Sequence, residues 1–364
     1  MNLMISELNS LREQGLYREI TTLAGIDFCT NDYLGFIRSD KISPLLFTAK
    51  SGAGASRLIP GFHEAAIETE NFLSQVYNID SVLFFGSGYL ANIGIIQALA
   101  NEDTEFFSDE FNHASIIDGM KLVKSKKQIF RHNNLSHLEE ILKKSFSKQK
   151  CVITESIFSM DGDSPDLKEL IKLCEKYDAF LVVDEAHATG VVGKNGLGLM
   201  EDFQYNKEKT IIVHTCGKAI GCYGAFVISG KIIRELLINK ARTLIYSTAL
   251  SPYIFKQIHF AINEVIKSGH LRTQIATNIQ YAKEQFKKKH LKLSGSHISY
   301  IEFLNSNKCP IQIEQQLKEK GLNVKGIRYP SVPKGQERLR ITIKSFNSQL
   351  EIQKLAITLK DILQ

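Results

Sequence analysis

The chain has 364 residues, of which 43% are apolar and 23% are charged, and its formal net charge is +6. This length and composition predict a folded protein with a large core and more than one domain, and they exclude a mainly disordered chain. The small positive charge favours anionic small molecules and is too weak to indicate a nucleic-acid partner.

The cysteines and the N-terminal residues indicate the cellular compartment in which the protein is expected. None of the six cysteines forms a CxxC pair, and several lie in apolar segments, which is typical of reduced, buried thiols. We therefore expect no disulfide framework and no metal. No basic segment precedes a long apolar run at the N-terminus, so we expect a cytoplasmic protein without a signal peptide.

Residues 1–18 and 81–100 have apolar patterns that more than one structure could explain. Residues 1–18 predict a short amphipathic helix that ends near Gly15 and packs on another part of the protein or on a second subunit. Residues 81–100 are uncharged, but GSG at 86–88 interrupts them, and Asn92 lies within them. A strand, a turn and a buried helix explain this stretch better than a membrane span.

From about residue 80, apolar strand-like runs alternate with helical segments. Strands are expected at 81–85, 104–109, 128–132, 151–156, 180–184, 210–215 and 225–229, and helices at 89–100, 113–123, 135–146 and 166–178. In the last helix, Asp166 and Glu169 have capping-box spacing. Because the strands are continuous apolar runs, we expect a mostly parallel α/β sheet with helices on both faces.

After about Pro252 the pattern changes to polar helices and a smaller α+β module. Its expected elements are strands at 298–303, 322–330 and 339–344, a helix at 311–320 and a final helix. The sequence thus predicts an N-terminal arm (1–35), a large domain (36–255) and a small C-terminal domain (256–364).

The ends of two expected strands carry an amine and a carboxylate. Asp184 closes the run FLVVD, and Lys218 follows the run at 210–213 within the glycine-rich segment HTCGKAIGCYGA. Ligands of parallel sheets bind at these strand ends. A lysine can form a Schiff base with a pyridine aldehyde, and a carboxylate can keep the ring nitrogen protonated, so that the ring accepts electrons. This pairing predicts a pyridoxal 5′-phosphate (PLP) enzyme.

Other residues could complete such a site. GSG at 86–88 opens a helix, so the N–H groups of Gly88 and Tyr89 could hold a phosphate. His187 could bond the phenolic oxygen of the ring, His113 could stack on it, and Arg340 could clamp a substrate carboxylate. Each residue taken alone has a commoner structural explanation, such as a turn acid, a satisfied core histidine or a surface cation.

Other chemistries fit less well. The chain has no G-x-S-x-G, Walker A or H-E-x-x-H motif. DEAH at 184–187 resembles a helicase box, but the GK pairs at 193–194 and 217–218 are followed by Asn195 and Ala219 instead of Ser or Thr. A helicase is therefore excluded.

Ordered motifs along nearly the whole chain carry a family resemblance. They are GLYR (15–18), NDYLGF (31–36), GAGASRLIPGFHEA (52–65), GSGYLAN (86–92), NHASIIDG (112–119), TESIFSMDGD (154–163), VVDEAHATGVVG (182–193), HTCGKAIG (214–221), LIYST (244–248) and VPKGQERLRIT (332–342). With them the chain resembles the α-oxoamine synthases, which are fold-type I PLP-dependent transferases with an aspartate aminotransferase-like fold.

The resemblance implies a role for each matching residue. Lys218 is the Schiff-base lysine and the base that removes the substrate's α-proton, and Asp184 is the partner of the pyridinium nitrogen. The other implied roles are ring stacking for His113, hydrogen bonds to the phenolic oxygen for Ser159 and His187, phosphate binding for Gly88, Tyr89 and Thr215, binding of the amino-acid carboxylate for Asn31 and Arg340, and contact with the far end of the acyl chain for Arg18. Ser247 and Thr248 would lie near the phosphate of a second subunit, which implies a homodimer.

Within the family, the chain is most similar to the branch that begins biotin biosynthesis. This likeness implies an acyltransferase that condenses L-alanine with a pimeloyl thioester, of coenzyme A or of acyl carrier protein, to 8-amino-7-oxononanoate, CO2 and the free thiol carrier. The alternatives are glycine with an acetyl or succinyl donor, serine with a long acyl chain, a signal-molecule synthase, or a PLP-binding scaffold without catalysis. Neither a nucleic-acid nor a membrane partner is expected.

Overall fold

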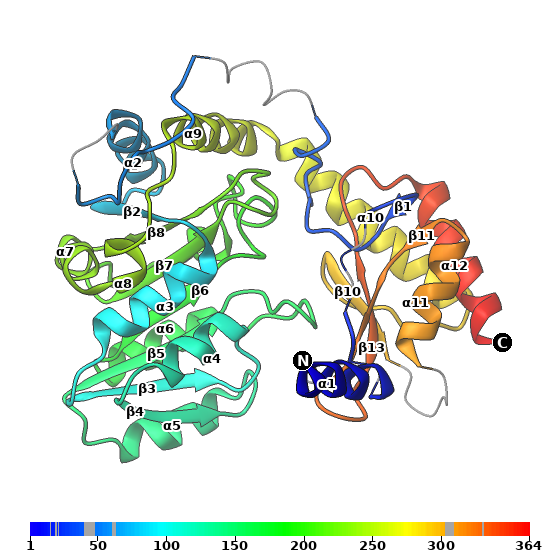
Figure 1. Ribbon diagram of the computed structural model, residues 1–364, viewed down its shortest axis with the longest axis horizontal. Coiled ribbons are helices and arrows are strands. Elements are labelled where there is room, and N and C mark those ends of the chain that lie inside the picture. The colour runs from blue at the N-terminus through cyan, green and yellow to red at the C-terminus, as the bar shows by residue number, and fades with distance from the viewer. Residues whose placement is uncertain are drawn as a thin grey trace.

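The structure is a computed structural model, and it describes residues 1–14, 16–18, 20, 22–39, 48–59, 63–302, 309–329 and 331–364. Figure 1 shows two lobes, one built around a broad central sheet and a smaller one that holds the C-terminus and the N-terminal helix. The domain boundaries expected at 35/36 and 255/256 remain a prediction.

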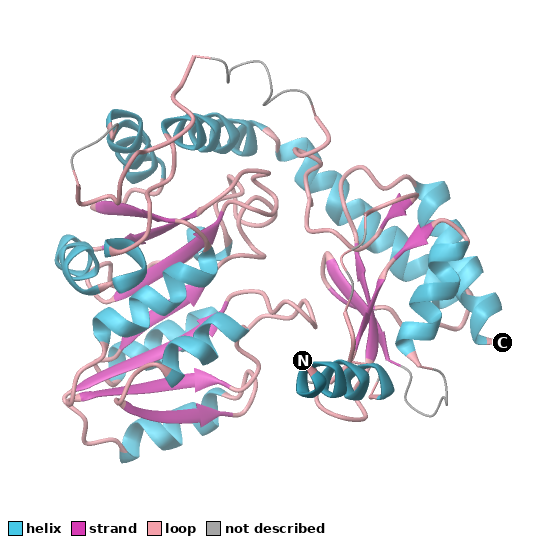
Figure 2. Ribbon diagram, in the orientation of Figure 1, coloured by secondary structure: helices cyan, strands magenta, loops and turns pink. Residues whose placement is uncertain are grey.

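The large lobe contains a seven-stranded sheet (Figure 2). Its strands are β2 (Ser81–Phe85), β3 (Thr104–Asp109), β4 (Lys126–Phe130), β5 (Gln149–Glu155), β6 (Phe180–Asp184), β7 (Thr210–Thr215) and β8 (Ala225–Ser229). Their order is β2-β8-β7-β6-β5-β3-β4, and only β8 runs antiparallel to its neighbours. The expected mostly parallel sheet is confirmed.

Helices cover both faces of this sheet, because each strand directs alternate side chains to opposite sides. Ile211 and Val213 of β7 join one core cluster, and Ile212 joins the other. The first cluster is covered by α3 (Gly88–Leu99), α4 (Ala114–Lys121), α7 (Lys231–Lys240) and α8 (Arg242–Ile245). The second is covered by α2 (Glu64–Val76), α5 (Leu135–Lys144), α6 (Leu167–Lys176) and α9 (Pro252–Lys267).

Helix α6 shows how its sequence sets its start and its buried face. The Asp166 side chain accepts the backbone N–H of Glu169, so one of the two hydrogen bonds of the expected capping box is confirmed. Leu167, Leu170 and Ile171 recur at helical spacing and are buried against the sheet.

The small lobe carries a four-stranded antiparallel sheet in the order β12-β13-β10-β9. Its strands are β9 (Ser294–Gly295), β10 (Ile298–Glu302), β12 (Lys325–Ile327) and β13 (Arg338–Thr342), and its helices are α10 (Gly269–Lys288), α11 (Pro310–Glu319) and α12 (Gln349–Leu363). The single strand expected at 322–330 is in fact two, because β11 (Leu322–Asn323) pairs with β1 (Ile26–Asp27) whereas β12 pairs with β13.

The N-terminal arm is held against the small lobe by the parallel β1–β11 pair. Helix α1 (Asn2–Glu13) precedes it, and Gly15, where the helix was expected to end, lies outside the described residues. The apolar stripe of α1 is largely uncovered, since Leu3 is 86% and Leu8 is 42% exposed. Among the described residues, no helix has the length and hydrophobicity needed to cross a bilayer.

Candidate active site

Asp184 lies at the C-terminal end of β6 and is held in one orientation. Its Oδ2 accepts a hydrogen bond of 2.7 Å from Nδ2 of Asn92 in α3, and its Oδ1 accepts the N–H of Ala186 at 2.9 Å. Glu155 is its register partner on β5. Burial, together with the nearby Asp184 charge, raises the pKa of Glu155 well above its usual value. Burial beside Asp184 therefore favours the protonated form of Glu155.

Lys218 lies in the turn that follows β7, and its Nζ is 2.7 Å from Nε2 of His187. Burial lowers the pKa of Lys218 to about 8, against the opposing influence of Asp184 and Glu155. Burial and the neighbouring Lys218 charge lower the pKa of His187 well below its usual value, so the imidazole stays neutral. A substantial share of Lys218 is then a free amine near neutral pH, as a nucleophile or base requires.

A chain of hydrogen bonds joins Lys218 to Arg340. The hydroxyl of Tyr33 is 2.6 Å from Nδ1 of His187 and donates to Oδ1 of Asn31 at 3.2 Å, and Arg340 donates to the same Oδ1 at 3.1 Å. Tyr33 has one hydroxyl proton, which goes either to Asn31 or to Nδ1 of His187, and in the first case Nδ1 carries a hydrogen and Nε2 accepts from Lys218. The chain therefore couples the tautomer of His187 to the contact between Tyr33 and Asn31.

Arg340 lies on β13 and is the residue through which the small lobe contacts the site. Its Nε donates to the carbonyl of Ser159 at 2.8 Å, and its side chain is almost fully buried. Asn31 from the N-terminal arm, Ser159 from the loop after β5 and Arg340 from the small lobe thus meet at one place. The expected role of the Ser159 hydroxyl remains a prediction, since its contact here is made by the backbone carbonyl.

The N-terminus of α3 forms a cradle suited to a phosphate. A Cβ at Gly88 would lie 2.4 Å from Oγ1 of Thr215, so only glycine fits there. Ser87 caps the helix by accepting the N–H of Leu90, and the other first-turn N–H groups lack helical partners. The Tyr89 hydroxyl is hydrogen-bonded to Asp118.

His113 is the N-cap residue of α4, and its Nδ1 is 2.8 Å from Oγ of Ser115. The Tyr89 ring lies edge-on to its imidazole, with 6.2 Å between the ring centroids. The His113 side chain is exposed, so a face of its ring is open to a stacking partner.

Three expected site residues lie farther from this group. Ser247 and Thr248 follow α8 and line a small cavity together with Gly86, at the end of β2. Arg18 is exposed after α1, and within the described parts of the chain no hydrogen bond or ion pair joins it to the residues above. The roles of these three residues remain predictions.

Four residues of the site escaped the sequence analysis. Asn92 and Glu155 flank Asp184, and Tyr33 connects His187 with Asn31. His297 lies edge-on to Tyr33, with ring centroids 4.5 Å apart. The motifs NDYLGF, GSGYLAN and TESIFSMDGD contain Tyr33, Asn92 and Glu155 and could have identified them, whereas His297 gave no sequence signal of its own.

One group of ligand-type side chains lies elsewhere, at His132, Asp161 and Asp163. The two ring nitrogens of His132 bind Asp109 and Asp163 at 2.8 and 2.9 Å. Burial opposes its protonation, but these two carboxylates outweigh burial and raise the pKa of His132 to about 9. A protonated imidazole has no lone pair for a metal, so this group is an ion-pair network.

The residues at the strand ends fit PLP. They supply a buried amine, a fixed carboxylate, a helix N-terminus at which only glycine fits, and an open imidazole face. Comparison with known proteins agrees, since residues 24–357 match the family model described as aminotransferase class I and II. The chain belongs to this family of fold-type I transferases, and PLP is its cofactor.

Individual relatives narrow the class to the α-oxoamine synthases. A protein of Methylobacillus flagellatus named 8-amino-7-oxononanoate synthase is 35% identical over 350 residues, which cover 94% of this chain and 88% of that one. The solved 8-amino-7-oxononanoate synthase of Francisella tularensis is 31% identical, with a TM-score of 0.80 and coverage of 93% and 97%. A serine palmitoyltransferase from S. paucimobilis with bound PLP–myriocin is 25% identical, with a TM-score of 0.88 and coverage of 98% and 96%.

Proposed function

We propose that this protein condenses L-alanine with a pimeloyl thioester and releases 8-amino-7-oxononanoate, CO2 and the free thiol carrier. The observation that carries this proposal is the full-length similarity to proteins named for that product. The hydrogen-bond chain from Lys218 to Arg340 supports it, because an α-amino acid needs a base at its Cα and a cation at its carboxylate.

The side chains divide the work of the reaction. PLP, when bound, supplies an electron sink for the negative charge that develops at the substrate Cα. Asp184 holds a proton on the pyridine nitrogen, and Lys218, as a free amine, moves the α-proton. Arg340 and Asn31 bind the α-carboxylate, which aligns the Cα–H bond with Lys218. The PLP phosphate is assigned to the N–H groups of Gly88 and Tyr89 and to Thr215.

A cavity of about 410 Å³ next to His113 and Ser159 supports an acyl donor with a hydrocarbon chain. Phe111, Ile117 and Phe158 give it an apolar wall. A chain of methylene groups gains free energy on leaving water for such a wall. We assign the acyl part of the thioester to this cavity.

We infer a homodimer in the cytoplasm. The apolar residues of α1 are exposed in the single chain, as are Tyr246 (72%) and Thr248 of the LIYST segment. A second subunit would cover such side chains, and Ser247 and Thr248 would then meet the phosphate of the partner.

The decisive experiment supplies the PLP-loaded protein with matched pairs of substrates and identifies the products by mass spectrometry. L-Alanine with pimeloyl-CoA or pimeloyl-acyl carrier protein should give 8-amino-7-oxononanoate. Glycine with acetyl- or succinyl-CoA and serine with palmitoyl-CoA serve as comparisons. Faster turnover of any of these pairs would overturn the substrate assignment and leave the α-oxoamine synthase chemistry standing.

A further inference from the structure

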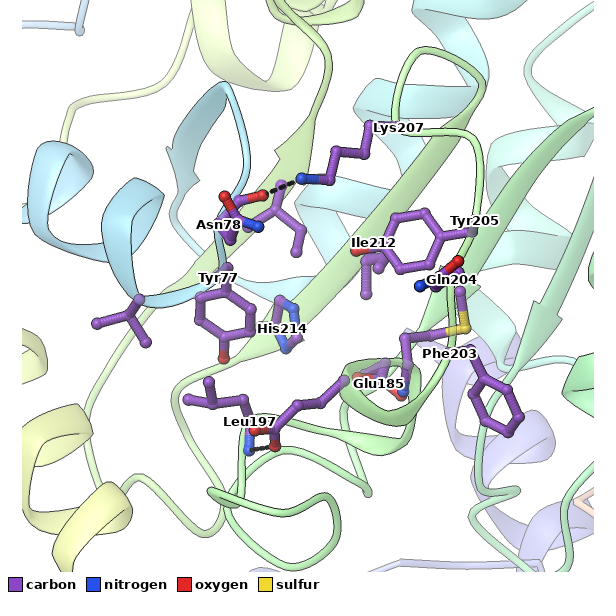
Figure 3. A pocket seen from close by; sticks show the side chains of 14 residues that line it. Tyr77, Asn78, Glu185, Leu197, Phe203, Gln204, Tyr205, Lys207, Ile212 and His214 are labelled. Atoms are coloured by element: carbon purple, nitrogen blue, oxygen red, sulfur yellow. Dashed lines mark hydrogen bonds between the residues drawn. The ribbon is translucent and has the colours of Figure 1, made fainter.

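A second, larger cavity lies behind the active site. It has a volume of about 510 Å³ and is bounded by the sheet, the end of α2 and the 197–207 loop (Figure 3). Glu185 and His214 form part of its wall. Each is the chain neighbour of a site residue, Asp184 or Thr215, and neighbouring side chains in a strand point to opposite faces. The cavity is therefore on the reverse face of β6 and β7 and separate from the PLP site.

His214 presents an unused hydrogen-bond acceptor to this cavity. Oγ1 of Thr189 is 2.8 Å from both the carbonyl of Glu185 and Nδ1 of His214, and we assign its proton to the carbonyl, so that Nδ1 donates to Oγ1. Burial lowers the pKa of His214 to about 3, so the ring stays neutral and Nε2 keeps its lone pair. His214 is 1% exposed, and its Nε2 has no hydrogen-bond partner among the described residues.

Tyr77 supplies an unused hydroxyl beside His214. The two ring centroids are 4.7 Å apart, and the Tyr77 hydroxyl is buried without a hydrogen-bond partner in the described part of the chain. A buried polar atom without a partner is costly, and such atoms are usually satisfied by a ligand or by water. Together with Oε2 of Glu185, three such atoms belong to residues that line one cavity, and they indicate a site for a molecule that offers both a donor and an acceptor.

The walls define the shape and charge of that molecule. Figure 3 shows the rings of Tyr77 and His214 on one side, and Tyr205, Gln204 and Phe203 on the other, with Ile212 between them. Flat apolar walls of this kind favour a flat ring. Burial also raises the pKa of Glu185 to about 8, although the N–H groups of Met200 and Leu199 oppose the shift. Glu185 is then largely protonated at neutral pH, and the other ionisable residues of the lining besides the tyrosines and His214 are Glu201 and Lys207.

We propose that this cavity binds an uncharged planar heterocycle that carries an N–H donor next to a carbonyl acceptor, as pyridones and nucleobases do. The N–H donates to Nε2 of His214, and the carbonyl accepts from the Tyr77 hydroxyl. The site does not depend on the proposed reaction, because neither residue belongs to the PLP site.

Ligand-observed saturation-transfer NMR on the PLP-loaded protein tests the proposal with 2-pyridone and 1-methyl-2-pyridone. The two probes share a ring and a carbonyl, and only the first can donate to His214. We expect 2-pyridone to bind at least about 5-fold more tightly, since leaving the buried Nε2 unsatisfied is costly. Tyr77→Phe, which removes only the hydroxyl, should weaken 2-pyridone binding by a similar factor, and His214→Phe should remove the difference between the probes.

Tyr281→Phe in α10 of the small lobe is the matched control and should bind both probes as the wild type does. The PLP absorbance of each variant shows that it has folded. Equal binding of the two probes, unchanged binding in Tyr77→Phe, or absence of saturation transfer would overturn the proposal. The last of these results would assign the cavity to water alone, since buried water also satisfies polar groups of this kind.

Discussion

Two lysines with lowered pKa values, the half-buried Lys218 in the large lobe and the fully buried Lys344 in the small lobe, have different partners. Lys344 of the small lobe is fully buried, and its Nζ donates to Oδ1 of Asp27 at 3.0 Å and to the Asp27 carbonyl at 2.9 Å. Lys218 of the large lobe faces a neutral imidazole, and no carboxylate lies within ion-pair distance of it among the described residues. Burial lowers the pKa of each to about 8.

The difference in partners separates a lysine that stabilises the fold, Lys344, from a lysine that can react, Lys218. Lys344 gains its stabilisation from a partner that is always present, and removal of either partner would leave a buried charge unpaired. Lys218 has no such partner, so its amine is available to a cofactor, and its lowered pKa makes the free form far more abundant near neutral pH than in an ordinary lysine. Each prediction below tests one side of this comparison.

The largest effect is expected for Lys218→Ala. Borohydride should fix PLP covalently to the wild-type chain and leave none on the variant, and turnover should fall below detection, because Lys218 is the amine that the described residues place beside His187 at the strand ends. Mass spectrometry of the reduced protein measures the bound PLP. Wild-type levels of fixed PLP on the variant would show that another lysine is the partner of the aldehyde.

Lys344→Met should lower the stability of the fold and should not act on the catalytic chemistry directly. Breaking a buried pair costs about 3–5 kcal/mol, and we expect a loss of this size in the free energy of unfolding, measured by urea titration. Lys218→Met is the matched control and should lose little stability, because it removes no ion pair. A comparable loss in both variants would break the distinction between the two lysines.

The cost of Lys344→Met should also depend on pH. Burial alone would raise the pKa of Asp27, but Lys344 and the hydrogen bonds from Thr30 and Cys29 outweigh it and hold this pKa far below its usual value. The ionised Asp27 therefore stabilises the fold above about pH 4, and this contribution is lost as the pH falls. The stability difference between wild type and variant should shrink from pH 7 to pH 3, and a constant difference would contradict the pairing.

Asp184→Asn should lower turnover about 10- to 100-fold without unfolding the protein. The neutral amide cannot hold the ring nitrogen as a cation, and a charged buried hydrogen bond contributes roughly 1.5–3 kcal/mol. The loss of turnover is measured against an unchanged unfolding midpoint. Near-normal turnover would show that Asp184 has only a structural role.

The sequence predicted the large lobe better than the connections between the lobes. Continuous apolar runs in the sequence indicated the strands of the sheet, and the GSG turn within 81–100 separated a strand from a helix. Asp184 and Lys218 could be located because one ends such a run and the other follows one closely. The contact of Tyr33 with His187 joins residues 154 positions apart and has no local pattern. The protonated state of Glu155 depends on burial and on the nearby Asp184 charge, which a single strand does not reveal.

Arg340→Lys should raise the KM for L-alanine about tenfold and leave PLP content unchanged. Lysine keeps the charge but loses the planar fork that reaches Ser159 and Asn31 and can bind a carboxylate with two parallel bonds. Steady-state kinetics and absorbance measure the two quantities. Arg234→Lys, in α7, is the control, and an unchanged KM in Arg340→Lys would move the carboxylate site elsewhere.

Tyr33→Phe should give the smallest effect, a few-fold loss of kcat, together with a change that a merely structural role would not produce. When the Tyr33 proton goes to Asn31, the Tyr33 oxygen accepts from Nδ1 of His187, so Nε2 can accept from the Lys218 ammonium. Without that oxygen the other tautomer becomes accessible, and the charged form of Lys218 loses an acceptor.

The pKa of Lys218 should therefore fall further in Tyr33→Phe, and its free amine should persist to lower pH. The pH dependence of Lys218 acylation in the PLP-free protein measures this, with Tyr281→Phe as the matched tyrosine control. A pH profile that stays in place would mean that Tyr33 only fills space, and the link between the two halves of the site would then depend on Asn31 and Arg340 alone.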